Sequence, residues 1–158
     1  MENENKKRLE FETQQVTDER GRTWYLWLGK LTGMDIDDAD KGLLNLKGTF
    51  DFDGAVQGIQ YILDSPFKGE DGRFVKRLGT VFAGELIRQL VNDMGVSSLS
   101  DFNNRYWYAM YEEKPGWGVN SFIRGIAHPN DKSKYIVWKD VIEEVKGMDW
   151  TKDQKDDN

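Results

Sequence analysis

The stretch RYWYAMYEEKPGWG at residues 105–118 decides the fold, because four aromatic side chains and a methionine occupy five of its first seven positions. On a β-strand, successive side chains point to opposite faces of the sheet. Trp107 and Tyr111 then share one face, while Tyr106, Tyr108 and Met110 share the other. Apolar side chains on both faces predict a central strand that is covered on both sides. The alternative is an aromatic patch that stays exposed for contact with a partner.

A helix is predicted at residues 80–94, ahead of this strand. Its apolar side chains recur with the 3.6-residue period of an α-helix and form a single stripe. Thr80 is placed to cap the start of the helix, and Gly95 to end it in the left-handed conformation. The stripe consists of Phe82, Ala83, Leu86, Ile87, Leu90, Val91 and Met94.

The rest of the chain has the short alternating segments that are typical of strands. We predict strands at residues 8–16, 22–31, 43–52, 55–63, 118–126 and 135–138, and a short helix at 139–146. Asp53 and Gly54 predict a tight hairpin between the third and fourth of these strands, because both positions of a type I′ turn need positive φ. Residues 32–42 and 65–79 are expected to be irregular connections.

These elements predict an α+β fold. We expect a mostly antiparallel, twisted β-sheet with one long amphipathic helix packed on one face and a short C-terminal helix. A chain of 158 residues is long enough for one domain with its own core. We expect a flexible N-terminus at residues 1–8, a single α+β domain at residues 9–148 and a flexible acidic tail at residues 149–158.

The composition excludes several classes of site. The chain has no cysteine, so disulfides, thiolate nucleophiles and cysteine-based zinc sites are impossible. The start of the chain has no apolar segment after its charges, and no apolar run approaches the roughly 20 residues that span a bilayer. We therefore expect a soluble cytoplasmic protein of the host cell, without contact to a membrane.

No catalytic or metal-binding motif has the spacing that its chemistry requires. An EF-hand loop around Gly54 would place Thr49 first and Gln60 twelfth, where calcium needs a carboxylate at both positions. His128, the single histidine, precedes a proline and is expected in a surface turn. The sequence has no phosphate-binding glycine loop and no nucleophile elbow. We expect no enzyme, no cofactor and no metal.

Charge indicates what kind of partner the protein binds. The chain has 28 acidic and 22 basic residues, a net charge of −6, and four of the carboxylates lie within residues 35–40. We expect these four to form an acidic loop that attracts a host or phage protein with a basic surface. Two tryptophans are expected to add aromatic contacts to that interface. The predicted partner-binding residues are Asp35, Asp37, Asp38, Asp40, Trp117 and Trp138.

Residues 83–126 carry a further pattern. Gly95, Val96, Leu99 and Phe102 form a step after the helix, Gly116, Trp117 and Gly118 form a turn, and Ile123, Gly125 and Ile126 form a return strand. This pattern resembles small proteins of unassigned function from bacteriophages and mobile elements, except that Asn103 and Asn104 replace a glycine-lysine turn. The resemblance implies an origin and gives no catalytic residue.

Together these features favour a non-enzymatic phage or mobile-element binding protein. Its expected role is to inhibit a host defence nuclease, of the anti-CRISPR or anti-restriction type, by occupying a basic surface. A first alternative is an accessory protein of phage replication or recombination that binds single-stranded nucleic acid through its aromatic side chains, beside Arg105 and Arg124. The net charge disfavours nucleic acid, because such proteins need a positive groove. A second alternative is a small-ligand-binding domain with its pocket between sheet and helix.

Overall fold

A computed structural model describes residues 13–40, 43–63, 66–68, 74–77, 79–116 and 121–147. The predicted flexible ends at 1–8 and 149–158 lie outside these residues, and so do the first residues of the strand that we predicted at 8–16. No helix among the described residues is long and apolar enough to cross a membrane.

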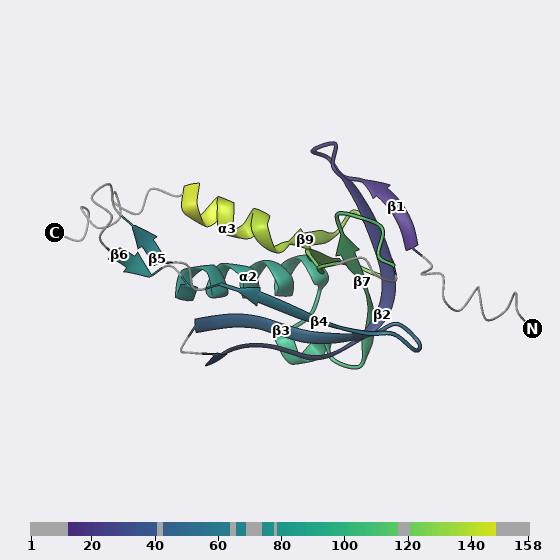
Figure 1. Ribbon diagram of the computed structural model, residues 1–158, viewed down its shortest axis with the longest axis horizontal. Helices are drawn as coiled ribbons and strands as arrows, with labels where there is room; N and C mark the ends of the chain where they lie inside the picture. Colours follow the sequence, from purple (N-terminus) through teal and green to yellow (C-terminus); the bar gives the residue numbers. More distant parts are fainter. Residues whose placement is uncertain are drawn as a thin grey trace, which may run out of the picture.

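An antiparallel sheet of seven strands forms the centre of the described structure. Its strands are β1 (Thr13–Thr17), β2 (Thr23–Asp40), β3 (Leu43–Asp51), β4 (Val56–Ile62), β7 (Arg105–Tyr111), β8 (Gly125–Ala127) and β9 (Tyr135–Val137). The order across the sheet is β4-β3-β2-β7-β8-β9, with β1 also paired to β2. Figure 1 shows β2 as a long curved strand, which pairs with β1, β3 and β7.

The length of β2 explains how this order arises. Its first residues pair with β1 along one edge, and its later residues pair with β3 along the same edge. Its opposite edge pairs with β7. A strand of 18 residues can therefore pair with three neighbours, and it holds β1 and β7 on opposite edges of its first half.

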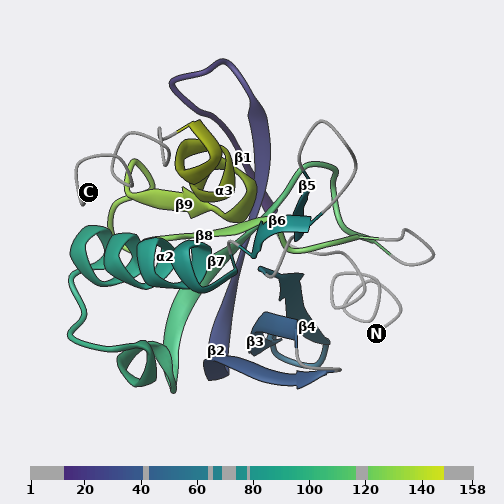
Figure 2. The same cartoon turned by 90° about the vertical axis from the view of Figure 1, so that its left-hand side faces the viewer.

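Two helices complete the α+β architecture. Helix α2 (Gly79–Met94) has 16 residues and helix α3 (Trp138–Gly147) has 10. We expected one long helix with a short companion, whereas both helices are of moderate length and contact each other (Figures 1 and 2). A 3₁₀ turn, η1 (Leu99–Phe102), follows α2. Helix α2 ends at Gly95 with φ of 70°, as predicted for a left-handed C-cap.

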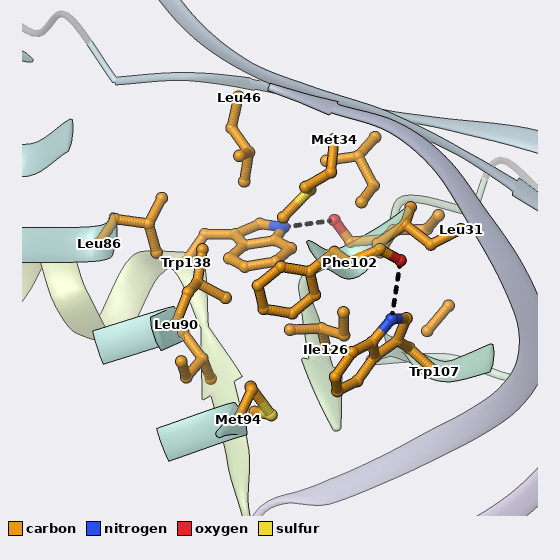
Figure 3. Close-up of a cluster of buried hydrophobic side chains, with 14 of the residues drawn as sticks. Leu31, Met34, Leu46, Leu86, Leu90, Met94, Phe102, Trp107, Ile126 and Trp138 are labelled. Carbon is orange, nitrogen blue, oxygen red and sulfur yellow. Dashed lines mark hydrogen bonds between the residues drawn. The ribbon is translucent and has the colours of Figure 1, made fainter. Parts of the chain in front are cut away.

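Strand β7 is buried on both faces, as its sequence predicted. Trp107 and Tyr111 belong to the main core that the sheet shares with both helices, whereas Tyr108 and Met110 belong to a smaller cluster on the other face. Tyr106 is the exception, with 58% of its surface exposed. In the main core, the Trp107 indole donates a hydrogen bond to the Phe102 carbonyl at 3.1 Å (Figure 3).

The hairpin prediction is confirmed. Asp53 and Gly54 have φ of 62° and 114°, and the Phe52 amide donates to the Ala55 carbonyl at 2.8 Å across the turn. Both central residues therefore have the positive φ of a type I′ turn, which matches the twist of strands β3 and β4.

Three expectations about secondary structure were wrong. Residues 32–40 are not a loop but the second half of β2, because Met34 and Ile36 alternate with Asp35 and Asp37 and cover the core. Residues 65–79 contain a small two-stranded sheet, β5 (Pro66–Lys68) and β6 (Phe74–Arg77). Of the strand predicted at 118–126, regular structure starts only at Gly125 and extends to Ala127; residues 117–120 lie outside the described part of the chain.

Candidate functional site

The acidic residues that we predicted as a partner-binding loop lie on a paired strand. Asp37 forms an ion pair with Lys47 of β3 at 2.5 Å, and Asp35 is the register partner of Lys47. The backbones of Asp38 and Asp40 belong to the same strand, while their side chains lie outside the described structure. The prediction of an acidic loop is wrong, because β3 pairs along this part of β2 and supplies a positive charge of its own.

The prediction for Trp138 is also wrong. Its side chain is only 1% exposed and lies between the sheet and the helices, where its indole donates to the Ile123 carbonyl at 3.2 Å (Figure 3). A tryptophan in this position stabilises the core and cannot contact a partner. Trp117, the other predicted tryptophan, lies outside the described residues.

A buried ion-pair cluster fixes the turn between β1 and β2 against helix α3. It consists of Asp18 in that turn, Arg22 and Trp24 at the start of β2, and Asp140 in α3; we call it the Asp18 cluster. The Arg22 guanidinium donates two hydrogen bonds to the Asp140 carboxylate, at 2.8 and 2.7 Å, and a third to Asp18 at 2.8 Å. The Trp24 indole donates to Asp18 at 2.8 Å. Residues 118 positions apart are joined in this way.

The Asp18 carboxylate is the most strongly perturbed acid of this cluster. Burial by itself would raise its pKa, but hydrogen bonds from the Trp24 indole and from the backbone and side chain of Arg22 outweigh that effect. The pKa falls from the ordinary value of 3.8 to about 2. The carboxylate therefore stays charged at any physiological pH and holds Arg22 in place.

An acidic groove lies beside this cluster. It has a volume of about 520 Å³ and runs between the second half of α2, the start of α3, the turn before β9 and the turn after β1. Its lining includes four carboxylates, from Glu19, Asp93, Asp140 and Glu144, and two cationic side chains, from Arg20 and Lys134. The difference, four minus two, gives the acidic groove a net charge of −2.

The carboxylates of the acidic groove differ in how far they are already engaged. Arg20 and Arg22 both contact Asp140. The Gln89 amide donates to Glu144 at 2.9 Å and thereby ties α2 to α3. Glu19 and Asp93 are exposed and form no ion pair with another described residue. Both side chains are accessible to a cation from outside, although the charge of Arg88 already acts on Asp93.

A second pocket lies on the other side of the Arg22–Asp140 ion pair. It has a volume of about 320 Å³, and Arg22, Trp24, Tyr61, Arg124 and Lys139 contribute to its lining. Glu112 also lines it and forms an ion pair with Arg124 at 3.6 Å. The Arg124 guanidinium also lies 5.2 Å from the ring centre of an exposed phenylalanine, Phe122. We call this pocket, with its residues Tyr61, Arg124 and Lys139 and with Phe122 beside it, the basic–aromatic pocket. Its chemistry is opposite to that of the acidic groove.

The described residues contain no group of three or more metal-ligating side chains. The His128 ring packs edge-on against Trp107, with its Nδ1 accepting a hydrogen bond from the Asn130 amide at 3.1 Å. That contact positions the turn after β8.

Sequence reasoning missed both surfaces because their residues come from distant segments. The acidic groove joins residues 19–20, 89–93, 133–137 and 140–144. The only local signal was helical spacing, since Gln89 and Asp93, like Asp140 and Glu144, lie four positions apart and share a helix face.

Comparisons with protein-family models, with curated proteins and with solved structures find no match to this chain.

Proposed function

We propose that this chain is a non-enzymatic binding protein whose acidic groove takes up a basic segment of another protein. The observation that carries the proposal is the pair of unengaged carboxylates, Glu19 and Asp93, at a groove with a net charge of −2. Lysine and arginine side chains complement such a groove in charge, and arginine can bind a carboxylate through two hydrogen bonds.

The rigidity of the groove supports the same proposal. The Asp18 cluster holds one wall, and the Gln89–Glu144 hydrogen bond joins the two helices that form the others. A site whose walls are fixed before binding loses less conformational entropy when the partner arrives. The net charge of −6 adds long-range attraction for basic partners.

The class of partner that we propose is a nucleic-acid-processing protein with a basic channel. Proteins that bind the phosphate backbone carry clusters of lysine and arginine, so an acidic protein can occupy their site. Inhibition of a host defence nuclease by a phage or mobile-element protein is the specific form of this proposal.

A fluorescent octa-arginine peptide tests the acidic groove without knowledge of the partner. Anisotropy titrations at low salt compare the wild type with a Glu19→Gln, Asp93→Asn variant. Two exposed ion pairs contribute up to about 1 kcal/mol each, so we expect affinity to fall roughly five-fold to ten-fold. High salt should remove most of the difference.

A matched control separates the groove from net charge. The Asp53→Asn, Glu113→Gln variant changes the net charge by the same amount, at two exposed positions outside the groove. We expect it to bind the peptide almost as well as the wild type. Equal losses in both variants would show that only total charge matters and would contradict the proposed site.

A second candidate function, binding of single-stranded nucleic acid, is favoured by the basic–aromatic pocket. Arg124 near the exposed Phe122 ring, with Lys139 in the same pocket, offers a cation and an aromatic face to a nucleotide. A phosphate would have to compete with Glu112 for Arg124 and with Glu143 for Lys139. Stacking of one base contributes about 1–3 kcal/mol. Phe122→Ala should therefore weaken binding of oligo-dT at low salt at least five-fold, whereas Tyr106→Ala, at another exposed aromatic residue, should not.

A ligand pocket between sheet and helices, our other alternative, gains no support. Phe102, Trp138 and Leu90 fill this layer and are at most 1% exposed, so a ligand would have to displace them (Figure 3).

A further inference from the structure

Strand β4 forms one edge of the seven-stranded sheet, and nothing in its sequence protects that edge. Proteins usually guard an edge strand with a lysine, a proline, a bulge or a short length. Strand β4 reads VQGIQYI, with seven residues, no charge and no proline, and its pairing with β3 contains no bulge. The other strands at the margins of the sheet are shorter, with five residues in β1 and three in β9.

The hydrogen bonds of the hairpin identify which β4 backbone groups are open. The Phe52 amide donates to Ala55, and the Leu63 amide donates to Leu44. Because hydrogen-bonded positions alternate along an antiparallel pair, Gln57, Ile59 and Tyr61 point their backbone groups toward β3. The groups that point outward belong to Val56, Gly58, Gln60 and Ile62, and the structure describes no strand on that side.

The same four residues are exposed, and two of them are large and apolar. Val56 is 69% exposed and Ile62 is 52% exposed, at opposite ends of the strand. The side chains of the alternate residues lie on the opposite face of β4 and are covered. The Gln57 side-chain amide donates to the Ser121 carbonyl, and Ile59 is buried in the core. The open edge and the exposed apolar side chains therefore coincide along β4.

We propose that the β4 edge pairs with the β4 edge of a second copy of this chain, antiparallel about a two-fold axis through Ile59. In this register Val56 lies opposite Ile62 of the second copy, and Gly58 lies opposite its Gln60. All four outward-pointing residues of each copy then form hydrogen-bonded pairs. Each exposed apolar side chain also gains an apolar partner on the same face.

The β4 edge is complementary to itself, and this favours a second copy of the chain as its binding partner. The two apolar side chains are symmetric about Ile59, so one two-fold axis satisfies both, as an isologous dimer requires. The strand carries no charge, so no like charges meet across the axis. The dimer would join two seven-stranded sheets into one continuous sheet, and it leaves the acidic groove of each copy outside the contact.

Analytical ultracentrifugation of the full chain tests whether the dimer forms. An interface of one strand pair is smaller than the standard size, so we expect a dissociation constant on the order of 10–100 µM. The Val56→Lys, Ile62→Lys variant places lysines opposite each other and should weaken the dimer at least ten-fold. The control, Leu28→Lys, Thr32→Lys, adds the same charge to exposed positions of the interior strand β2 and should leave it intact.

Cysteine cross-linking tests the register, because the chain has no cysteine of its own. Hydrogen-bonded partners lie about 5.5 Å apart between Cα atoms, which a disulfide can bridge. A mixture of Val56→Cys and Ile62→Cys chains should therefore cross-link on oxidation. Either variant alone should not, since its two cysteines lie six residues apart along the pair, roughly 20 Å.

A monomer throughout this concentration range would overturn the proposal, as would a dimer that the β4 lysines leave unchanged. Cross-linking of either single variant as fast as the mixture would refute the register. A monomeric chain that binds a strand-forming peptide at β4 would show that the edge serves a different partner, and this result also counts against the dimer.

Discussion

At the scale of single residues, Asp18 connects the stability of the protein to pH. Its folded pKa of about 2 lies below the ordinary value of 3.8, so the charged form is favoured by folding. The stabilisation is complete above about pH 5 and is lost as the pH falls from about 4 toward 2. A shift of this size corresponds to at most about 2 kcal/mol, because the Asp18 side chain is 2% exposed but its partner Arg22 is 33% exposed and is partly screened by solvent.

Replacement of Asp18 by Asn tests this role. Arg22 and Trp24 lose their charged acceptor inside the Asp18 cluster, so we expect the free energy of unfolding at pH 7 to fall by about 2–4 kcal/mol. Urea titrations between pH 2.5 and pH 7 measure the effect. Glu113→Gln, at an exposed carboxylate, is the control. A variant as stable as the wild type at pH 7 and equally sensitive to acid would contradict the role of Asp18.

At the scale of secondary-structure elements, replacement of glycine by alanine should have opposite effects on stability at Gly125 and at Gly84. A Cβ atom on Gly125 of β8 would lie 2.2 Å from the Ile136 carbonyl oxygen of β9, so the two strands would have to separate. We expect Gly125→Ala to lower the free energy of unfolding by at least about 2 kcal/mol. Gly84 of helix α2 has nothing within 4 Å of that position, and Gly84→Ala should add about 0.5–1 kcal/mol.

Thermal and urea unfolding of both variants measure the contrast. Similar changes in the two variants would mean that β8 and β9 are not as close as described. A destabilising Gly84→Ala would mean that another group packs against this face of α2.

The elements also show what the sequence could predict. Helix α2, strand β7 and the β3–β4 hairpin have strong local signals, namely a 3.6-residue stripe, apolar residues on two faces and an Asp-Gly turn. Residues 32–40 have glycine and four carboxylates, which are typical of loops. Their pairing with β3 and the burial of Met34 override that local preference. Trp138 was misplaced because we predicted it at the end of a strand, whereas it begins helix α3 and its side chain packs into the core.

At the scale of the whole molecule, the acidic groove and the basic–aromatic pocket meet at one ion pair, between Arg22 and Asp140. Arg22 lines the pocket that contains Arg124 and Lys139, while Asp140 lines the acidic groove, and the two residues are bonded to each other. Val137 contributes to both surfaces. The fold joins the turn between β1 and β2 to α3, and in this way it places an acidic and a basic surface side by side. Neither was visible in the sequence, because each combines segments far apart along the chain.

Chemical-shift mapping of the ¹⁵N-labelled protein with octa-arginine peptide, at low salt, locates where a basic partner binds. We expect the largest amide shifts at Glu19, Asp93 and Ser133, around the acidic groove, because unengaged carboxylates concentrate there. The same spectra report on Asp35, Asp37 and Asp53, whose carboxylates lie outside the groove, and these amides should move little. Shifts concentrated at the groove would support it as the binding site; shifts spread over all exposed carboxylates, or centred on β2 at residues 35–37, would contradict it.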